Sequence, residues 1–300
     1  MEQAMIQIDH FTKKYGINKG VFDVNLQIGK GEVYGYLGVN GAGKSTTMRH
    51  LMGFSKPSSG VLKIAGYDCW KEQKKIQPLV GYLPGEIAFP EDMTGIAYLE
   101  LIGNIRKMKD VSYRTQLIEY FDIDTKVKLK KMSKGMKQKI GIIAAFMHNP
   151  KVLLLDEPTS GLDPYMQKQF IQLVEAEKEK GKTILLSSHI FEEIEKTCDR
   201  IGMIRNGVFQ REFIMSDLRH SQYKTYKIEL KDENSLCKLR EIYPNAKISF
   251  EKKQIVLSIC DAEINELIQV LSHCEIQFLK EEKHTLEEYF MEYYGGEKND

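Results

Sequence analysis

The sequence predicts an α/β protein whose core is a parallel sheet, with a smaller α+β domain after it. A glycine-rich loop at residues 38–46 lies between a short apolar stretch and a stretch with helical spacing, as in a strand–loop–helix unit. Residues 152–155 form a continuous apolar run that ends in two acids, which is typical of a parallel strand covered on both faces. After about residue 220 the pattern changes to the order β-α-β-β-α-β. We therefore expect two domains, at residues 1–219 and 220–300.

The composition is that of a globular protein. The 300 residues are 42% apolar, and the formal net charge of +1 gives no general attraction to nucleic acid or acidic lipid. No apolar run approaches the roughly 18–20 residues that cross a bilayer, and the segment after Met1 lacks the pattern of a signal peptide. Scattered cysteines predict neither a zinc site nor a disulfide framework and fit a reducing compartment: Cys69, Cys198, Cys237, Cys260 and Cys274.

Short strands are predicted at residues 6–8 and 24–28, with a turn-rich connection between them. Tyr15 lies in this connection. An exposed aromatic there could stack on a nucleobase, worth roughly 1–3 kcal/mol, or it could be an ordinary loop tyrosine.

The glycine-rich loop has the residues that phosphate binding requires, and it fits the pattern of two glycines around four residues, followed by Lys and Ser. Glycines let successive N–H groups point at one anion. Lys44 supplies a mobile positive charge for the outer phosphates, and the Ser45 hydroxyl can ligate Mg²⁺. The helix predicted at 46–54 favours bound phosphate through its dipole. The candidate nucleotide-binding residues are Gly38, Asn40, Gly41, Ala42, Gly43, Lys44, Ser45 and Thr46.

Two further strands, at 61–65 and 80–84, precede a mainly helical segment from about residue 86 to 150. Within it we expect helices at 94–108 and 114–121 from the spacing of their apolar residues. Ser133 is a good N-cap for the next helix, whose start could be a plain capped terminus or a second anion site.

Two acids follow the apolar strand, at the end where parallel sheets bind ligands. Asp156 can hold Mg²⁺, and Glu157 can orient or deprotonate a water. The alternative is a strand that simply ends in an acidic turn. After a turn at 160–164 and a helix from 165 toward 180, the strand at 183–187 ends beside His189. This histidine is either structural or a donor to a γ-phosphate.

A helix at 190–198 and a hairpin that turns at Asn206-Gly207 complete the first domain. The tail has no motif for chemistry, and its element order suggests a ferredoxin-like domain that serves dimerisation or regulation, or is a structural appendage. We expect strands at 223–230, 246–250, 255–259 and 276–279 and helices at 235–242, 263–271 and 285–294.

Together these residues resemble the ATP-binding cassette (ABC) family over about residues 5–216. The motifs occur in the family's order: the loop ending in Lys44-Ser45-Thr46, the signature-like segment 132–136, the Asp156-Glu157 strand, the turn 160–163 and His189. The resemblance implies a parallel core with an antiparallel β subdomain and a helical subdomain, in an ATPase that uses ATP and Mg²⁺. Residues 1–219 are then the ATP-binding domain and 220–300 an accessory domain. Tyr15 falls at the family's adenine-stacking aromatic.

The resemblance also implies a head-to-tail dimer with two ATP sites, each shared by two subunits. One subunit would supply Lys44, Ser45, Asp156, Glu157 and His189, and the other Ser133 and Gly135. The implied catalytic residues are Glu157, which polarises the attacking water, with His189 and Lys44. Ser45 and Asp156 are the implied metal ligands, and Asp163 couples the two sites.

The sequence departs from the family at two places. Lys134 and Met136 stand where the commonest signature has glycine and glutamine, although Ser133 and Gly135 are kept. The family's Mg²⁺- and water-contacting glutamine should follow residues 82–84, where this chain has Gly85-Glu86. Either Glu86 substitutes, near the metal or as the link to a membrane partner, or water fills the gap.

Within the family, the signature and the separate tail resemble ATPase subunits of type-2 exporters of drugs, antimicrobial peptides or polysaccharides. This implies efflux through a separately encoded polytopic membrane subunit, at the cytoplasmic face of the cell membrane. The ATPase dimer would form with itself or with a related ATPase subunit, and no nucleic acid is expected as a partner. The alternatives are a soluble ABC-type ATPase without a membrane partner and an importer subunit. The sequence does not identify the cargo.

Overall fold

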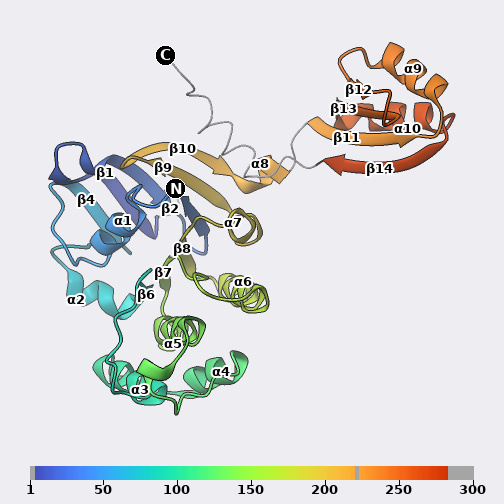
Figure 1. Ribbon diagram of the computed structural model, residues 1–300. Coiled ribbons are helices and arrows are strands. Elements are labelled where there is room, and N and C mark those ends of the chain that lie inside the picture. The colour runs from blue at the N-terminus through green and yellow to red at the C-terminus, as the bar shows by residue number, and fades with distance from the viewer. Residues whose placement is uncertain (1–3, 220–222, 283–300) are drawn as a thin grey trace. The chain divides into compact units, whose positions relative to one another are not determined.

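The computed structural model describes residues 4–219 and 223–282 (Figure 1). The chain divides into two compact units, Met1–Met215 and Ser216–Asp300, and each is described here by itself. Within the described residues, no helix is long and apolar enough to cross a membrane.

The first unit is built on a ten-stranded sheet in the order β5-β4-β1-β2-β10-β9-β3-β8-β7-β6. Its parallel part contains β3 (Val33–Leu37), β6 (Val80–Leu83), β7 (Val152–Asp156), β8 (Thr183–Ser188) and β9 (Arg200–Arg205). Every residue of β3, β7 and β8 is buried, as continuous apolar runs predict for strands covered on both faces. The parallel α/β core predicted from the sequence is confirmed.

The other part of this sheet is largely antiparallel. It contains β1 (Ile6–Gly16), β2 (Lys19–Ile28), β4 (Ser59–Ile64), β5 (Tyr67–Asp68) and β10 (Val208–Ile214). β1 pairs antiparallel with both β2 and β4, and β10 pairs antiparallel with β9. β10 follows a tight turn in which Asn206 and Gly207 both have positive φ, as the Asn-Gly pair predicted.

One prediction about this region was wrong. The segment between residues 8 and 24 is not a turn-rich connection, because β1 and β2 continue through it and reverse only at Ile17-Asn18. Asn18 has a φ of +56°, a conformation that asparagine tolerates better than most residues. The outer half of the hairpin is largely exposed, so its side chains lack the apolar alternation from which a strand is recognised. Tyr15 therefore lies on a strand rather than in a loop.

The N-cap predicted at Ser133 is confirmed, and Thr94 and Asp163 cap two further helices in the same way. The side chains of Thr94, Ser133 and Asp163 each accept a backbone N–H of the following helix. Helices α3, α4 and α5 lie together as a helical region between β6 and β7 in the chain (Figure 1). The helices of this unit are α1 (Lys44–Leu51), α2 (Gln73–Ile76), α3 (Gly95–Ile105), α4 (Ser112–Tyr120), α5 (Lys134–Phe146), α6 (Pro164–Glu179) and α7 (Phe191–Thr197), and α8 (Met215–Arg219) follows. Short 3₁₀ turns occupy Gln77–Leu79, Leu129–Lys131 and, in the second unit, Asp261–Glu263.

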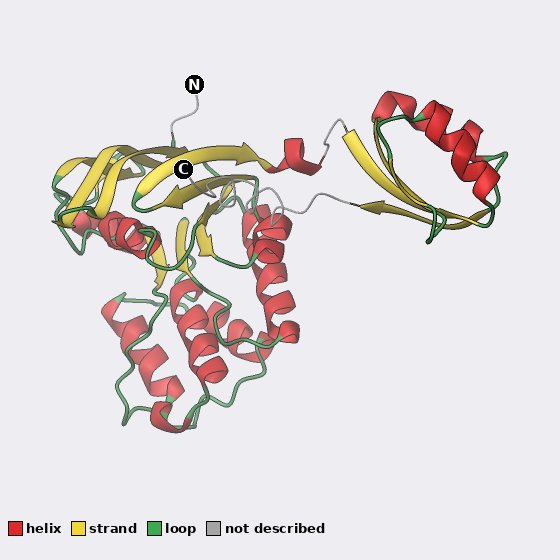
Figure 2. Cartoon of the chain, turned by 45° about the horizontal axis from the view of Figure 1, so that its top comes forward, coloured by secondary structure: helices red, strands yellow, loops and turns green. Residues whose placement is uncertain are grey.

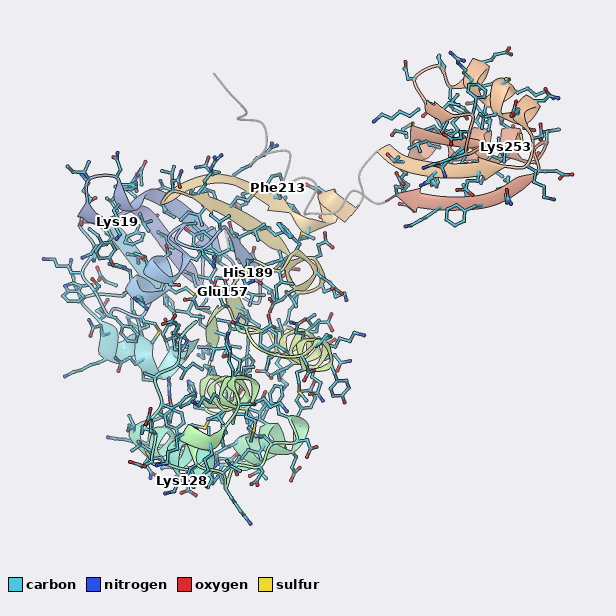
Figure 3. All side chains as sticks on the ribbon, in the orientation of Figure 1. Lys19, Lys128, Glu157, His189, Phe213 and Lys253 are labelled. Atoms are coloured by element: carbon cyan, nitrogen blue, oxygen red, sulfur yellow. The ribbon has the colours of Figure 1, made fainter. Side chains whose placement is uncertain are left out.

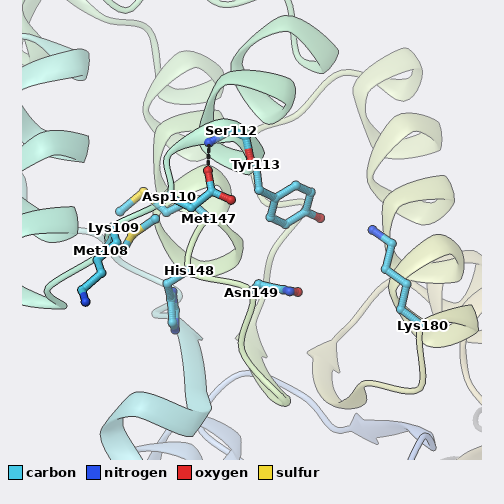
Figure 4. A pocket seen from close by; sticks show the side chains of 9 residues that line it. All are labelled: Met108, Lys109, Asp110, Ser112, Tyr113, Met147, His148, Asn149 and Lys180. Carbon is cyan, nitrogen blue, oxygen red and sulfur yellow. Dashed lines mark hydrogen bonds between the residues drawn. The ribbon is translucent and has the colours of Figure 1, made fainter.

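A buried ionic cluster joins the helical region to the core. The Tyr113 hydroxyl of α4 donates to Oε1 of Glu177 of α6 at 2.6 Å, and Lys180 donates to the same oxygen at 2.7 Å. Lys182, which is also buried, pairs with the other oxygen of Glu177. Burial alone would raise the pKa of Glu177, but the hydrogen bonds from Lys180, Lys182 and Tyr113 outweigh it and lower this pKa. A pocket of about 450 Å³ lies beside the cluster, with Tyr113, His148 and Lys180 in its wall (Figure 4).

The second unit is a four-stranded sheet with two helices on one face (Figure 2). The sheet order is β12-β13-β11-β14, and all neighbouring strands are antiparallel. The element order β-α-β-β-α-β agrees with the sequence pattern, and the ferredoxin-like assignment stays a prediction. The helix expected at 285–294 lies outside the described residues. The elements are β11 (Tyr223–Leu230), α9 (Glu233–Ile242), β12 (Lys247–Ser249), β13 (Gln254–Cys260), α10 (Ile264–Leu271) and β14 (Ile276–Glu282).

Candidate nucleotide-binding site

The candidate site lies at the carboxyl ends of three neighbouring parallel strands. β8 pairs with β3 on one side and with β7 on the other. In this register Leu37 lies opposite Ser188, and Ser187 lies opposite Asp156. The glycine-rich loop after β3, the acids after β7 and the histidine after β8 therefore meet at one edge. Figure 3 shows Glu157 and His189 next to each other there.

The glycine-rich loop is shaped by close approaches of the backbone. A Cβ at Gly38 would lie 2.5 Å from the carbonyl oxygen of Ile204, so no larger residue fits. Gly43 has a φ of +113°, and a Cβ there would lie 2.8 Å from Val21 Cγ2. Gly43 is the residue before α1 and supplies no side-chain cap, so first-turn N–H groups of α1 remain for a ligand. Such a terminus is suited to phosphate.

Lys44 is held inside the loop that it follows. Its side chain is 5% exposed, and Nζ donates to the carbonyl oxygens of Gly38 at 2.5 Å and Val39 at 3.4 Å. Nζ also lies 3.2 Å from Glu157 Oε1, an ion pair without hydrogen-bond geometry. The loop cation and the acid that follows β7 are therefore neighbours, as the sequence predicts.

Glu157 lies between this cation and an imidazole. Its Oε2 is 2.5 Å from His189 Nδ1, while Oε1 is buried and accepts no hydrogen bond. Its backbone has a φ of +50°, a strained conformation that costs about 1–3 kcal/mol and occurs most often at functional sites. The N–H of Glu157 donates to the Ser187 carbonyl at 3.0 Å, which helps to hold this conformation. A carboxylate of fixed orientation, with one oxygen that accepts no hydrogen bond, can accept a proton from water.

Asp156 and Ser45 provide a donor set that fits Mg²⁺. Asp156 is 2% exposed, and its Oδ1 accepts from Ser187 Oγ at 2.5 Å. Ser45 is on α1, which packs against β7. The described residues contain no group of three His, Cys, Asp or Glu that could hold a metal ion by themselves. One carboxylate and one hydroxyl suit Mg²⁺, which usually takes one or two carboxylates, waters and substrate phosphates.

Gly85 lies in front of the Asp156 carboxylate. A Cβ at Gly85 would be 3.4 Å from Asp156 Oδ2, an ordinary contact distance. Glu86 is exposed and forms no ion pair with any residue that the structure describes. The position nearest the Asp156 carboxylate therefore carries no side chain. Of the two explanations for the missing glutamine, this favours water in its place over Glu86 near the metal.

The signature-like segment contacts a different part of its own chain. Ser133 Oγ accepts the Met136 N–H at 3.2 Å, so the predicted N-cap is confirmed. Lys134 Nζ donates to Ser160 Oγ at 3.1 Å, and a Cβ at Gly135 would lie 3.1 Å from the Gly161 carbonyl oxygen. The structure thus brings this segment to the turn at 160–163 and not to the phosphate loop of the same chain. Asp163 ends that turn and caps α6.

Tyr15 is 57% exposed at the end of β1, and Lys13 Nζ lies 5.5 Å from the centre of its ring. An exposed ring of this kind is available for stacking. No contact joins it to the phosphate loop in the described part of the chain.

Sequence reasoning missed two residues that support Glu157. Gln138 of α5 is buried and donates from Nε2 to the Pro158 carbonyl at 2.6 Å. Ser187 accepts the Glu157 N–H and donates to Asp156. The signals available were a serine near the end of a largely apolar strand and an amide on the buried face of a helix.

The comparisons with known proteins agree with this geometry. Residues 21–160 match the family model described as ABC transporter. The chain is 32% identical to the bacitracin transport ATP-binding protein BcrA of Bacillus licheniformis over 98% of both chains, and 36% identical to the linearmycin resistance ATP-binding protein LnrL of Bacillus subtilis over 68% of this chain and 67% of that protein. A solved ATP-binding subunit of an ABC transporter superposes with a TM-score of 0.66 at 29% identity, over 72% of this chain and 92% of that one. This chain belongs to the ABC transporter family as an ATP-binding subunit, an ATPase.

Proposed function

We propose that this chain hydrolyses ATP to drive efflux of a drug or antimicrobial peptide through a separately encoded membrane subunit. The carboxylate of Glu157, held between Lys44 and His189 at the mouth of the phosphate loop, is the observation that carries the ATPase part. The export part is supported by the relative named for bacitracin transport, because the alignment with it includes both units of this chain.

In the proposed mechanism the residues of the loop and α1 bind the phosphates. Backbone N–H groups of residues 40–46 and the Lys44 ammonium hold the anion. Ser45 and Asp156 hold Mg²⁺, which when bound neutralises phosphate charge and fixes the phosphate oxygens. Glu157 Oε1, which has no hydrogen-bond partner, orients a water and takes its proton as the oxygen attacks the γ-phosphorus. The bond between the γ-phosphorus and the bridging oxygen breaks, and ADP leaves with that electron pair.

His189 has two tasks in this mechanism. Its Nδ1 lies 2.5 Å from Glu157 Oε2, so it keeps the carboxylate turned toward the water. Its side chain is 56% exposed, which leaves the ring able to reach a phosphate oxygen as a donor.

The site is completed by a second subunit in this proposal. Ser133 is exposed and neither it nor Gly135 contacts the phosphate loop of its own chain. We assign them to the ATP of a partner, either a second copy or a related ATPase subunit, in a head-to-tail dimer. The turn that ends at Asp163 touches the signature segment through Lys134 and Ser160, which suits Asp163 to couple the two sites. Residues 1–219 act as the ATP-binding domain and 220–300 as a ferredoxin-like accessory domain.

The proposed location is the cytoplasmic face of the cell membrane, where the chain contacts a polytopic subunit. The test is affinity capture of the tagged chain from detergent-solubilised membranes of the native cell, followed by mass spectrometry. A polytopic chain in stoichiometric amount supports the exporter, and a second ATPase chain reveals a mixed dimer. Soluble partners alone would favour the alternative, a soluble ATPase of the same family. No feature of the described residues supports this alternative.

Tyr15→Ala is expected to weaken ATP binding by about 5- to 150-fold, the equivalent of the 1–3 kcal/mol of a base stacked on an aromatic ring. Tyr15→Phe keeps the ring and should bind as the wild type does. Binding of inorganic tripolyphosphate, which has no base, should be unchanged in both variants. Ile17→Ala, at a neighbouring side chain that is 97% exposed, is the control. Equal loss of ATP and tripolyphosphate binding in Tyr15→Ala would remove the stacking role.

Glu86→Ala is expected to leave the ATPase rate of the isolated chain within about twofold of wild type but to reduce export in cells. The reason is that Gly85, not Glu86, faces Asp156, whereas Glu86 is exposed and available to a membrane partner. Water then fills the metal-facing gap. ATPase assays and drug-resistance assays on the same variant separate the two roles. A large loss of basal ATPase would place Glu86 at the metal instead, and unchanged export would end the coupling role.

A further inference from the structure

A buried carboxyl group on α7 lies behind the pair formed by Glu157 and His189. Glu193 is 2% exposed, and its Oε2 accepts hydrogen bonds from Ser188 Oγ at 2.6 Å and from Thr159 Oγ1 at 3.1 Å. Ser188 is the residue before His189, and Thr159 is two residues after Glu157. One carboxylate oxygen therefore joins the two segments that carry the proposed base and its histidine.

The Glu193 carboxyl group has few interactions that offset the cost of burying an acid. Glu193 forms no ion pair within residues 4–219 and 223–282, and its Oε1 is buried without a hydrogen-bond partner. Burial raises the pKa of Glu193 to about 7, although the hydrogen bonds from Ser188 and Thr159 lower it in part, and the nearby charge of Glu157 raises it further. An acid in this position costs folding stability, so stability alone does not explain why it is there.

The segment that Glu193 holds is the one on which catalysis depends. Glu157 has a strained φ of +50°, and such a conformation persists only when its surroundings fix it. Ser187 binds the N–H of Glu157, Gln138 binds the Pro158 carbonyl, and Glu193 binds the Thr159 hydroxyl. Each residue from 157 to 159 is thus tied to a different element. Displacement of a catalytic group by about 1 Å can cost on the order of 10²-fold in rate.

We propose that Glu193 is a positioning residue for ATP hydrolysis, which keeps Glu157 and His189 in contact by holding Thr159 and Ser188 on one oxygen. The inference rests on the proposed role of Glu157 as the base. Other charged groups face Glu193: Glu157 from the turn after β7, Glu192 and Lys196 from α7, and Lys168 from α6 across a cavity of about 60 Å³.

The first test compares Glu193→Ala and Glu193→Gln in the purified full chain, with Glu192→Ala as the matched control. Glu192 is the preceding residue, is exposed and pairs with Lys196. We expect Glu193→Ala to lower kcat by about tenfold or more, as loss of a charge-assisted hydrogen bond does, with the KM for ATP within about twofold. Glu193→Gln keeps an acceptor for both hydroxyls and should restore kcat to within about threefold of wild type. Rates are normalised to folded protein measured by thermal unfolding.

Thr159→Val is the second variant, because it removes the same hydrogen bond from the opposite side without touching Glu193. It should lower kcat in the wild-type background and have little further effect in Glu193→Ala. Additive losses, or a Glu193→Ala enzyme with the kcat of the Glu192→Ala control, would overturn the inference. If Glu157→Gln also turned over normally, the proposed function would fail as well, so the two failures are distinguishable.

The pH profile supplies a readout that a purely structural role would not move. As pH rises from 6 to 8, Glu193 ionises and accepts its two hydroxyl hydrogen bonds more strongly, whereas glutamine at this position cannot change. The ratio of wild-type kcat to Glu193→Gln kcat should therefore rise across this range. The two enzymes differ only at residue 193, so the ratio isolates the change at this position. A ratio that stays flat would contradict the positioning role.

Discussion

Replacing Glu157 by glutamine is expected to lower the rate of ATP hydrolysis by about 10²-fold or more while ATP binding persists. The amide has the size of the carboxylate and can still accept a hydrogen bond from His189, but it cannot take a proton from the attacking water. Phosphate release gives kcat, and binding of a fluorescent ATP analogue gives affinity. Size-exclusion chromatography with ATP shows whether the variant is held as a dimer.

The matched control for this experiment is Glu192→Gln, the same substitution at an exposed glutamate of the same unit. It should hydrolyse ATP at the wild-type rate. Turnover of the Glu157→Gln enzyme at near the control rate would remove Glu157 from the role of base. Loss of ATP binding together with hydrolysis would show that the substitution had damaged the phosphate loop rather than the chemistry.

Glu177→Ala is expected to destabilise the first unit by about 3–5 kcal/mol, because it leaves the buried Lys182 ammonium without its partner. The Tyr113 hydroxyl also loses its acceptor. For a unit of this size the loss corresponds to a fall in Tm of roughly 2–4 °C for each kcal/mol. Thermal unfolding followed by circular dichroism measures it. Glu175→Ala, an exposed residue of the same helix, should change Tm little.

The contribution of Glu177 has a defined pH dependence. Its pKa is held below the ordinary value of 4.5, so the stabilisation is complete above pH 4.5 and is lost as pH falls through the lower folded pKa. The gap in Tm between wild type and Glu177→Ala should therefore narrow in acid. A gap that is absent at pH 7, or that matches the Glu175→Ala control, would show that the ionic cluster does not hold the helical region to the core.

Local rules account for the parts of the site that the sequence predicted. The phosphate loop is recognised from a contiguous sequence pattern, and the strand that ends at Asp156 is predicted to be buried because the residues before this acid are all apolar. The cap at Ser133 follows from the side-chain oxygen that precedes its helix. These inferences need only neighbours in the chain. The joining of Lys44 to Glu157 followed from the rule that parallel strands present their carboxyl ends at one edge.

The remaining parts depend on contacts between distant segments. Glu193 bonds Thr159 across 34 positions, and Tyr113 bonds Glu177 across 64, so neither partner can be named from local pattern. A glutamate on an amphipathic helix is ordinarily solvated, which is why both buried acids were passed over. The outer part of the β1–β2 hairpin was missed because its side chains do not alternate between apolar and polar. Backbone pairing alone continues the two strands there.

The ion pair between Lys44 and Glu157 places a carboxylate of the chain itself on the ammonium group of the phosphate loop. If Lys44 binds the phosphates as proposed, polyphosphate competes with this carboxylate for the same ammonium group, and nucleotide binding is an exchange of one anion for another. In the proposed mechanism, the carboxylate released in that exchange is the group that then takes a proton from water. Under the proposed mechanism, binding of the substrate and release of the Glu157 carboxylate are in this way one event.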